Sequence, residues 1–235
     1  MSRGGGPAGP RFDDADLQQG LRLSGEDKQH FARRRIEHLG RCLGQARARV
    51  QRVLDFGCGA GESCPLLLEL PGARRVVGVD ASPRLVARAR ALDRARGADP
   101  ERLSYMHSDE QPPDGSFDLV YCNGVFHHID PAERPAALRY IRGCLRPGGL
   151  LALWENNPWN LGAQLVMRRI PFDRDARPIA PLAAWRLVRR CGLAPLRFDA
   201  LFIFPRALAW LRPLERLVQR LPLGAQYQLL CRREG

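Results

Sequence analysis

Lysine is almost absent from this 235-residue chain, in which Lys28 is the single lysine among 37 lysines and arginines. The formal net charge is +12, which would ordinarily favour a nucleic acid or an anionic membrane as partner. The arginines, however, are scattered along the sequence and form no basic segment. We therefore interpret most of this charge as a solvated surface and do not expect a nucleic-acid partner.

Long apolar runs are missing as well, and none approaches the roughly 18–20 residues that span a bilayer. The first ten residues, MSRGGGPAGP, lack the apolar stretch of a secretory signal, so we expect a cytoplasmic protein. The seven cysteines form no C-x-x-C pair, and the five histidines show no metal-ligand spacing with them. This pattern predicts reduced thiols and no bound metal.

The composition is that of an ordinary globular protein, with 45% hydrophobic and 26% charged residues. Residues 1–10 are rich in glycine and proline and are predicted to form a disordered tail. Residues 11–235 are predicted to form a single domain. Its first helix, at about 24–44, would act as a lid, and the capping-box sequence Ser24-Gly25-Glu26-Asp27 would open it.

Strand-like and helical segments alternate through the first two thirds of the chain. The helix after Ser82 has that serine as N-cap, Pro83 at its first position and Gly97 as its stop. Such alternation predicts β-α-β units and a mostly parallel sheet. Two more strands, at 196–204 and 225–232, would flank a helical insert at about 205–222. The earlier strands are predicted at 52–56, 75–80, 103–107, 117–122 and 150–155.

A glycine-rich loop follows the first of these strands. Asp55 ends the strand, and Gly57, Gly59 and Gly61 let the backbone turn sharply and approach a ligand. The G-x-G-x-G spacing differs from the G-x-G-x-x-G of nicotinamide-binding loops. Asp55 and Glu62 place a negative charge on each side of the loop, which suits a cationic ligand better than a phosphate.

A second acid, Asp80, ends the next strand, where a carboxylate can accept hydrogen bonds from both hydroxyls of a ribose. Four motifs occur in this order along the chain: DFGCGAGE, GVDAS (which contains Asp80), SFDLVYCNGVFHHI and LRPGGLLAL. Together they resemble the class I S-adenosylmethionine-dependent methyltransferases over about residues 24–160. The resemblance implies a Rossmann-like three-layer α/β sandwich, a seven-stranded mostly parallel sheet with an antiparallel last strand, and S-adenosylmethionine as cofactor.

The same resemblance assigns roles to single residues. Asp109 would meet the adenine amine, although the stretch after it is shorter than in relatives, so that Glu110 or Ser108 could replace it. The other cofactor residues would be Asp55, Gly57, Gly59 and Gly61 at the methionine portion, Asp80 at the ribose, Ala81 at the adenine and Asn123 near the sulfonium.

Two further groups of polar residues are candidates for the acceptor side. His127 or His128 could serve as general base for a hydroxyl acceptor, or the two could be structural. The segment WENNPWN follows the fifth strand, where ligands bind in open α/β folds. Its Asn-Pro-Trp lacks the second proline of N-P-P-[YFW] and does not follow the fourth strand, so we do not expect base methylation. The candidate acceptor residues there are Trp154, Glu155, Asn156 and Asn157.

The insert at 205–222 combines an apolar stripe with arginines and is interrupted by Pro213. It could be an ordinary lid, or residues 202–221 could rest on the inner face of an anionic membrane. Our expectation is methyl transfer to oxygen or carbon of a small or lipid-like acceptor. Two alternatives stay open, an RNA or protein methyltransferase and a non-catalytic cofactor-binding partner subunit.

Overall fold

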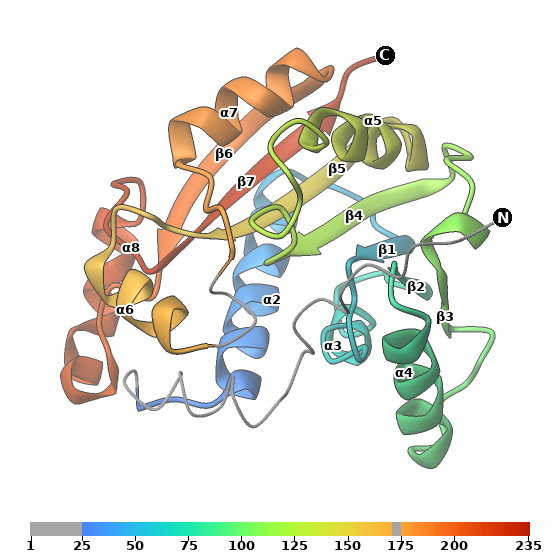
Figure 1. Cartoon of the computed structure of the whole chain (residues 1–235), viewed down its shortest axis with the longest axis horizontal. Helices are drawn as coiled ribbons and strands as arrows, with labels where there is room; N and C mark the ends of the chain where they lie inside the picture. Colours follow the sequence, from blue (N-terminus) through green and yellow to red (C-terminus); the bar gives the residue numbers. More distant parts are fainter. Residues whose placement is uncertain (1–24, 171–174) are drawn as a thin grey trace, which may run out of the picture.

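A computed structural model of the chain, shown in Figure 1, describes residues 25–170 and 175–235. Its sheet has seven strands in the order β3-β2-β1-β4-β5-β7-β6. Strands β1 to β5 pair with one another in parallel, whereas β7 runs antiparallel to both β5 and β6. The predicted Rossmann-like sheet with an antiparallel last strand is confirmed. The strands are β1 Arg52–Phe56, β2 Arg75–Asp80, β3 Leu103–His107, β4 Phe117–Asn123, β5 Leu145–Asn156, β6 Leu193–Leu201 and β7 Gln226–Arg233.

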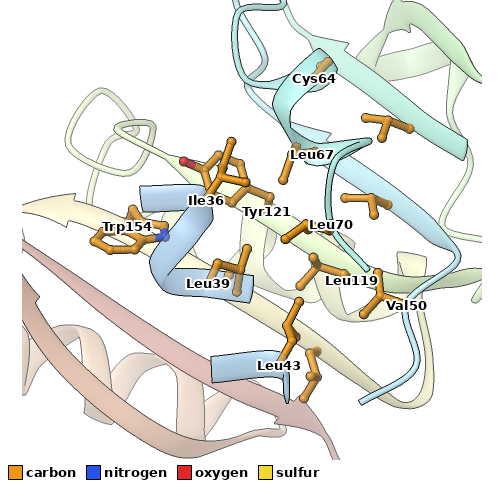
Figure 2. Close-up of a cluster of buried hydrophobic side chains, with 14 of the residues drawn as sticks. Ile36, Leu39, Leu43, Val50, Cys64, Leu67, Leu70, Leu119, Tyr121 and Trp154 are labelled. Atoms are coloured by element: carbon orange, nitrogen blue, oxygen red, sulfur yellow. The ribbon is translucent and has the colours of Figure 1, made fainter. Parts of the chain in front are cut away.

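Helices cover both faces of this sheet and produce two hydrophobic cores. One core joins α2, α3 and α4 to the sheet, and Figure 2 shows Ile36 and Leu39 of α2 beside Tyr121 and Trp154. The other core lies under α5 and α7. The α-helices are α2 Lys28–Gln45, α3 Cys64–Leu67, α4 Pro83–Ala95, α5 Arg134–Cys144, α6 Leu161–Arg169, α7 Pro181–Arg190 and α8 Glu215–Val218.

The first described helix begins three residues later than its capping-box pattern indicates. Asp27 is the N-cap of α2, because its carboxylate accepts the backbone N–H of His30 at 2.7 Å. Ser24 and the predicted tail at 1–10 lie outside the described residues. By contrast, Ser82 caps α4 as predicted, and its hydroxyl accepts the N–H of Leu85.

The region between β6 and β7 differs most from the sequence prediction. β6 ends at Leu201, three residues early, and Phe202 has a left-handed backbone with φ of 62°. The predicted helical insert, interrupted at Pro213, consists of a 3₁₀ segment, η4 Arg206–Leu214, and the short α8; Pro213 lacks the N–H that a continuous α-helix would need there. Nowhere in 25–170 or 175–235 is a helix both long and apolar enough to cross a membrane.

Candidate functional site

A cavity of about 1050 Å³ opens at the carboxyl ends of β1, β2, β4 and β5. It lies where the strand order reverses between β1 and β4, which is the usual ligand position in open α/β sheets. The loop after β1 is fixed there, because the N–H groups of Gly57 and Cys58 both donate to the carbonyl of Val79 on β2. The sheet topology therefore brings the predicted cofactor motifs together.

Each of the three loop glycines has a positive φ, between 56° and 80°, but they do different things. A Cβ on Gly57 would collide with Val125. Gly59 faces open space within the cavity, where a Cβ would meet nothing within 4 Å. Gly61 does not line the cavity; a Cβ there would lie 2.6 Å from the Tyr105 ring, so this glycine allows close packing under the loop.

Asp80 lines the cavity and organises the backbone around it. One carboxylate oxygen accepts the N–H of Gly59 at 2.9 Å, and the other accepts the N–H of Ser82 at 2.8 Å. A carboxylate offers about four acceptor positions, so two remain for the hydroxyls of a ribose. Ala81, which follows directly, lines the same part of the cavity.

Asp55 is a buried carboxyl on the cavity wall. Burial raises its pKa to about 7, and the neighbouring charge of Asp80 acts in the same direction. The thiol of Cys64 donates to it at 3.2 Å, which opposes that rise only in part. A bound cation would favour the ionised form, so this carboxyl couples ligand binding to pH. Glu62, the other predicted acid, also lines the cavity but forms an ion pair with Lys28.

The residues present fit S-adenosylmethionine in one further respect. Asn123, at the end of β4, lines the cavity, and its Oδ1 is buried with no hydrogen-bond partner among the described residues. A buried amide oxygen without a partner is costly, so this atom is suited to an N–H or a positively polarised group of a ligand. Asn123 would thus hold the cofactor together with Asp55, Asp80 and the open space over Gly59.

Asp109 does not reach the cavity, contrary to its assigned role at the adenine. It lies in a 3₁₀ turn, Ser108–Glu110, where its side chain is 89% exposed. The turn is capped by His107, whose Nδ1 accepts the N–H of Asp109, and this cap directs the aspartate outward. Ser108 lines the cavity instead, as the second of the two replacements considered from sequence.

The histidine pair lies at the cavity wall, as both His127 and His128 line it. His127 is buried, and its Nδ1 lies 2.7 Å from Oε2 of Glu155. The other oxygen of Glu155 accepts the N–H groups of Val125 and Phe126 at 3.1 and 2.7 Å. These bonds stabilise the carboxylate, which fixes the imidazole ring. The His128 ring packs against it at a tilt of 50°, with 4.1 Å between centroids.

Of the four candidate acceptor residues, only Asn156 lines the cavity. Trp154 is fully buried in the core that joins α2 to the sheet, because strand β5 continues past Trp154 to Asn156. Glu155 faces His127, as described above. Asn157 is a buried structural residue whose amide donates to the carbonyls of Pro222 and Gly224 at 2.9 Å. The acceptor-pocket prediction is therefore wrong in geometry for Trp154, Glu155 and Asn157.

The apolar wall of the cavity comes from segments that sequence motifs did not single out. Leu165, Val166 and Met167 of α6 lie on one side, and residues 202–205 lie on another. Phe31 of α2 lines the cavity too and contacts Phe202 edge to face, with 4.8 Å between ring centroids. An amphipathic pattern in α6 was the available signal, but it did not indicate which side faces the cavity.

A separate buried cluster carries metal-ligating atoms. Within the described ranges, atoms of His38, Cys42 and Asp199 lie within 4.8 Å of one another. Burial opposes ionisation of Asp199, but hydrogen bonds from His38 and Arg197 outweigh it and lower its pKa. Arg220 lies 3.6 Å from its other oxygen. Two guanidinium groups already balance this carboxylate, so we interpret the cluster as an ion-pair network that anchors α2 to β6.

Comparison with known proteins identifies a methyltransferase domain in the chain. A methyltransferase-domain family model matches residues 53–149. Trans-aconitate 2-methyltransferase of Azoarcus sp. is 38% identical over 144 residues, covering 57% of this chain and 53% of that protein. A tRNA U34 carboxymethyltransferase of Shewanella sp. is 40% identical over 103 residues, covering 43% of this chain and 30% of that protein. The chain thus matches about half or less of the length of these curated relatives.

Solved structures agree on the fold. An S-adenosylmethionine-dependent methyltransferase from Mesorhizobium loti superimposes with a TM-score of 0.59 at 21% identity, covering 79% of this chain and 92% of that one. A chain from the complex between the Haloferax volcanii Trm112 methyltransferase activator and a methyltransferase gives 0.62 at 22% identity, covering 94% and 97%. The motifs, the sheet order and the family match agree that residues 53–149 form a methyltransferase domain, and the chain has the fold of S-adenosylmethionine-dependent methyltransferases.

Proposed function

We propose that the protein transfers a methyl group from S-adenosylmethionine to oxygen or carbon of a small, lipid-like acceptor. The observation that carries this proposal is the composition of the large cavity described above. Polar cofactor residues line the strand ends, and apolar side chains of α6 and residues 202–205 line the rest. Its volume of about 1050 Å³ is at the upper end of small-molecule sites, which leaves room for an acceptor beside the cofactor.

S-adenosylmethionine, when bound, supplies a methyl group on a positively charged sulfur with a good leaving group. The protein then needs chiefly to align the acceptor and to exclude water. Asp80 would hold the ribose, and Ala81 would pack on the adenine beside Ser108. Asp55, Asn123 and the backbone at Gly57 and Gly59 would hold the methionine portion. Gly61 would not contact the cofactor but would let the loop pack closely on Tyr105. These roles come from the family resemblance together with the positions described above.

His127 is the better placed of the two histidines for general-base catalysis. Glu155 is the hydrogen-bond partner of Nδ1, and this arrangement favours a proton on that nitrogen. Nε2 can then take the proton of an acceptor hydroxyl as the oxygen attacks the methyl group. Such assistance contributes typically about 10²–10⁴-fold in rate. We assign Glu155 as a positioning residue for this step and His128 as a packing partner of the base.

Methyl transfer from radiolabelled S-adenosylmethionine tests the proposal directly. The full chain would be incubated with hydroxylated isoprenoids, fatty acids, soluble carboxylic acids, bulk tRNA and a protein lysate in parallel. We expect label in the apolar acceptors and its loss in Asp80→Ala. Transfer only to the soluble acids or macromolecules would refute the lipid-like acceptor. Binding of S-adenosylhomocysteine without transfer to any class would support a non-catalytic subunit.

RNA methylation is the second candidate. It is supported by the net charge of +12 and by the relative that is a tRNA U34 carboxymethyltransferase. The apolar wall of the cavity argues against it, because a polynucleotide would be expected to meet polar and basic side chains there. The tRNA arm of the same assay distinguishes the two.

A further inference from the structure

Exposed large hydrophobic side chains are strongly clustered in the folded protein. Of the eleven found in residues 25–170 and 175–235, nine lie in two segments, 159–165 and 208–223. We call these two segments together the rim surface. Trp210 is 75% exposed, and Leu161 and Leu217 are each 79% exposed. Single exposed leucines are ordinary, but a concentration of this kind indicates an interaction surface.

The two segments of the rim surface are far apart in sequence and adjacent in space. The amide of Asn160 donates to the carbonyl of Leu223 at 2.8 Å, and the amide of Asn157 donates to the carbonyls of the residues on either side of Leu223. In Figure 1, α6 and α8 accordingly lie next to each other at one end of the sheet. Leu165 and Arg212, one from each segment, also line the cavity. The rim surface therefore borders the cavity mouth.

The charge around these apolar side chains has one sign. The rim surface and the residues directly beside it, 159–170 and 205–223, contain six arginines and a single acid, Glu215. The exposed arginines are Arg168, Arg169, Arg206, Arg216 and Arg220. The carboxylate of Glu215 is occupied, since Oε1 accepts the N–H groups of Ile203 and Phe204. The partner of this surface should thus be both apolar and anionic.

We propose that the rim surface rests on a bilayer that contains anionic phospholipids. Tryptophan and leucine side chains would enter the interfacial region while the arginines contact lipid phosphates. A protein partner in this place would cover the cavity mouth, whereas a bilayer would supply an apolar molecule to it. This last step rests on the proposed function, because only a lipid-like acceptor needs delivery from a membrane. The docking itself does not depend on it.

Co-sedimentation of the full chain with vesicles of phosphatidylcholine, with or without about 30% phosphatidylglycerol, tests the docking. We expect binding to the anionic vesicles and a loss of about tenfold or more in Trp210→Ser/Leu217→Ser. The matched control is Leu182→Ser/Leu196→Ser, which removes two exposed leucines outside the rim surface and should bind as the original chain does. Arg216→Gln/Arg168→Gln should weaken binding mainly at low salt.

The same variants separate this inference from the proposed function. Binding of S-adenosylhomocysteine by calorimetry should be equal in all of them, which shows that each variant is folded. Absence of vesicle binding, or equal binding by Trp210→Ser/Leu217→Ser and its control Leu182→Ser/Leu196→Ser, would overturn the docking. A concentration-dependent dimer that only Trp210→Ser/Leu217→Ser abolishes would overturn it in favour of a second copy. Methyl transfer without vesicle binding would leave the enzyme proposal intact.

Discussion

Lowering the pH from 8 to 6 should weaken the binding of S-adenosylmethionine about tenfold. The carboxyl of Asp55 has a pKa raised to about 7, so it is about nine-tenths ionised at pH 8 and about one-tenth ionised at pH 6. If the cationic ligand binds the ionised form, affinity follows that fraction, and tenfold corresponds to about 1.4 kcal/mol. Titration calorimetry at both pH values and equal ionic strength measures the change.

Asp55→Asn is the control, because it removes the titrating group and keeps the side-chain shape. This variant should bind more weakly than the original chain at pH 8 and equally at both pH values. A tenfold pH dependence that persists in the variant would refute the reasoning and would point to His127 or His128 instead.

The stability of the ligand-free protein should change with pH in the opposite direction. The folded pKa of Asp55 lies above its ordinary value of 3.8, so the folded state binds the proton more tightly than the unfolded state. Its contribution to the free energy of unfolding is complete below about pH 4 and declines as the pH rises toward 7.

Substitutions in three other places, the glycine loop, Asp199 and Glu155, test further parts of the structure. Gly57→Ala should lower the free energy of unfolding by about 2 kcal/mol, through collision and a left-handed backbone; Gly59→Ala, which meets open space, should cost less stability and should mainly weaken cofactor binding. An equal loss of stability in both would contradict this assignment. Asp199→Asn removes the carboxylate from the buried ion-pair network and should lower the free energy of unfolding, measured in urea, by about 3 kcal/mol. A loss below 1 kcal/mol would argue against the ion-pair interpretation. Glu155→Gln should reduce kcat with little change in KM and should alter the pH profile of methyl transfer, with partial rescue by Glu155→Asp. An unchanged pH profile would leave Glu155 a structural role only.

The first three parallel strands were predictable residue by residue, whereas β5 begins at Leu145, five residues before its predicted start. β1, β2 and β3 begin and end where the sequence prediction places them, because runs of apolar and β-branched residues are bounded by charged residues or the glycine loop. The positions of the residues at the strand ends then followed from the sheet topology, since parallel strands have their carboxyl ends at one edge of the sheet. The family resemblance assigned Asp55, Asp80 and Asn123 to one cofactor site, and the shared edge of the parallel strands is why they line one cavity.

The acceptor side was not predictable in the same way. Trp154 and Asn156 lie on the same strand, but one is in the core and the other on the cavity, because pairing with β7 extends β5 to Asn156. Asp109 turns outward because of a local cap by His107, a residue that seldom takes this role. Such outcomes depend on contacts between distant segments, for which a single sequence holds no periodic signal.

The order of strands at the C-terminal edge has a consequence for how the chain folds during synthesis. β6 borders β7 in the sheet, and β7 in turn separates it from β5. β6 and the apolar segment after it therefore cannot join the sheet until β7 has been made. Until then the chain exposes an unpaired strand and several leucines, which is the condition under which nascent proteins aggregate or recruit chaperones. Expression yield should thus depend more on events at this edge than on the cofactor half of the fold.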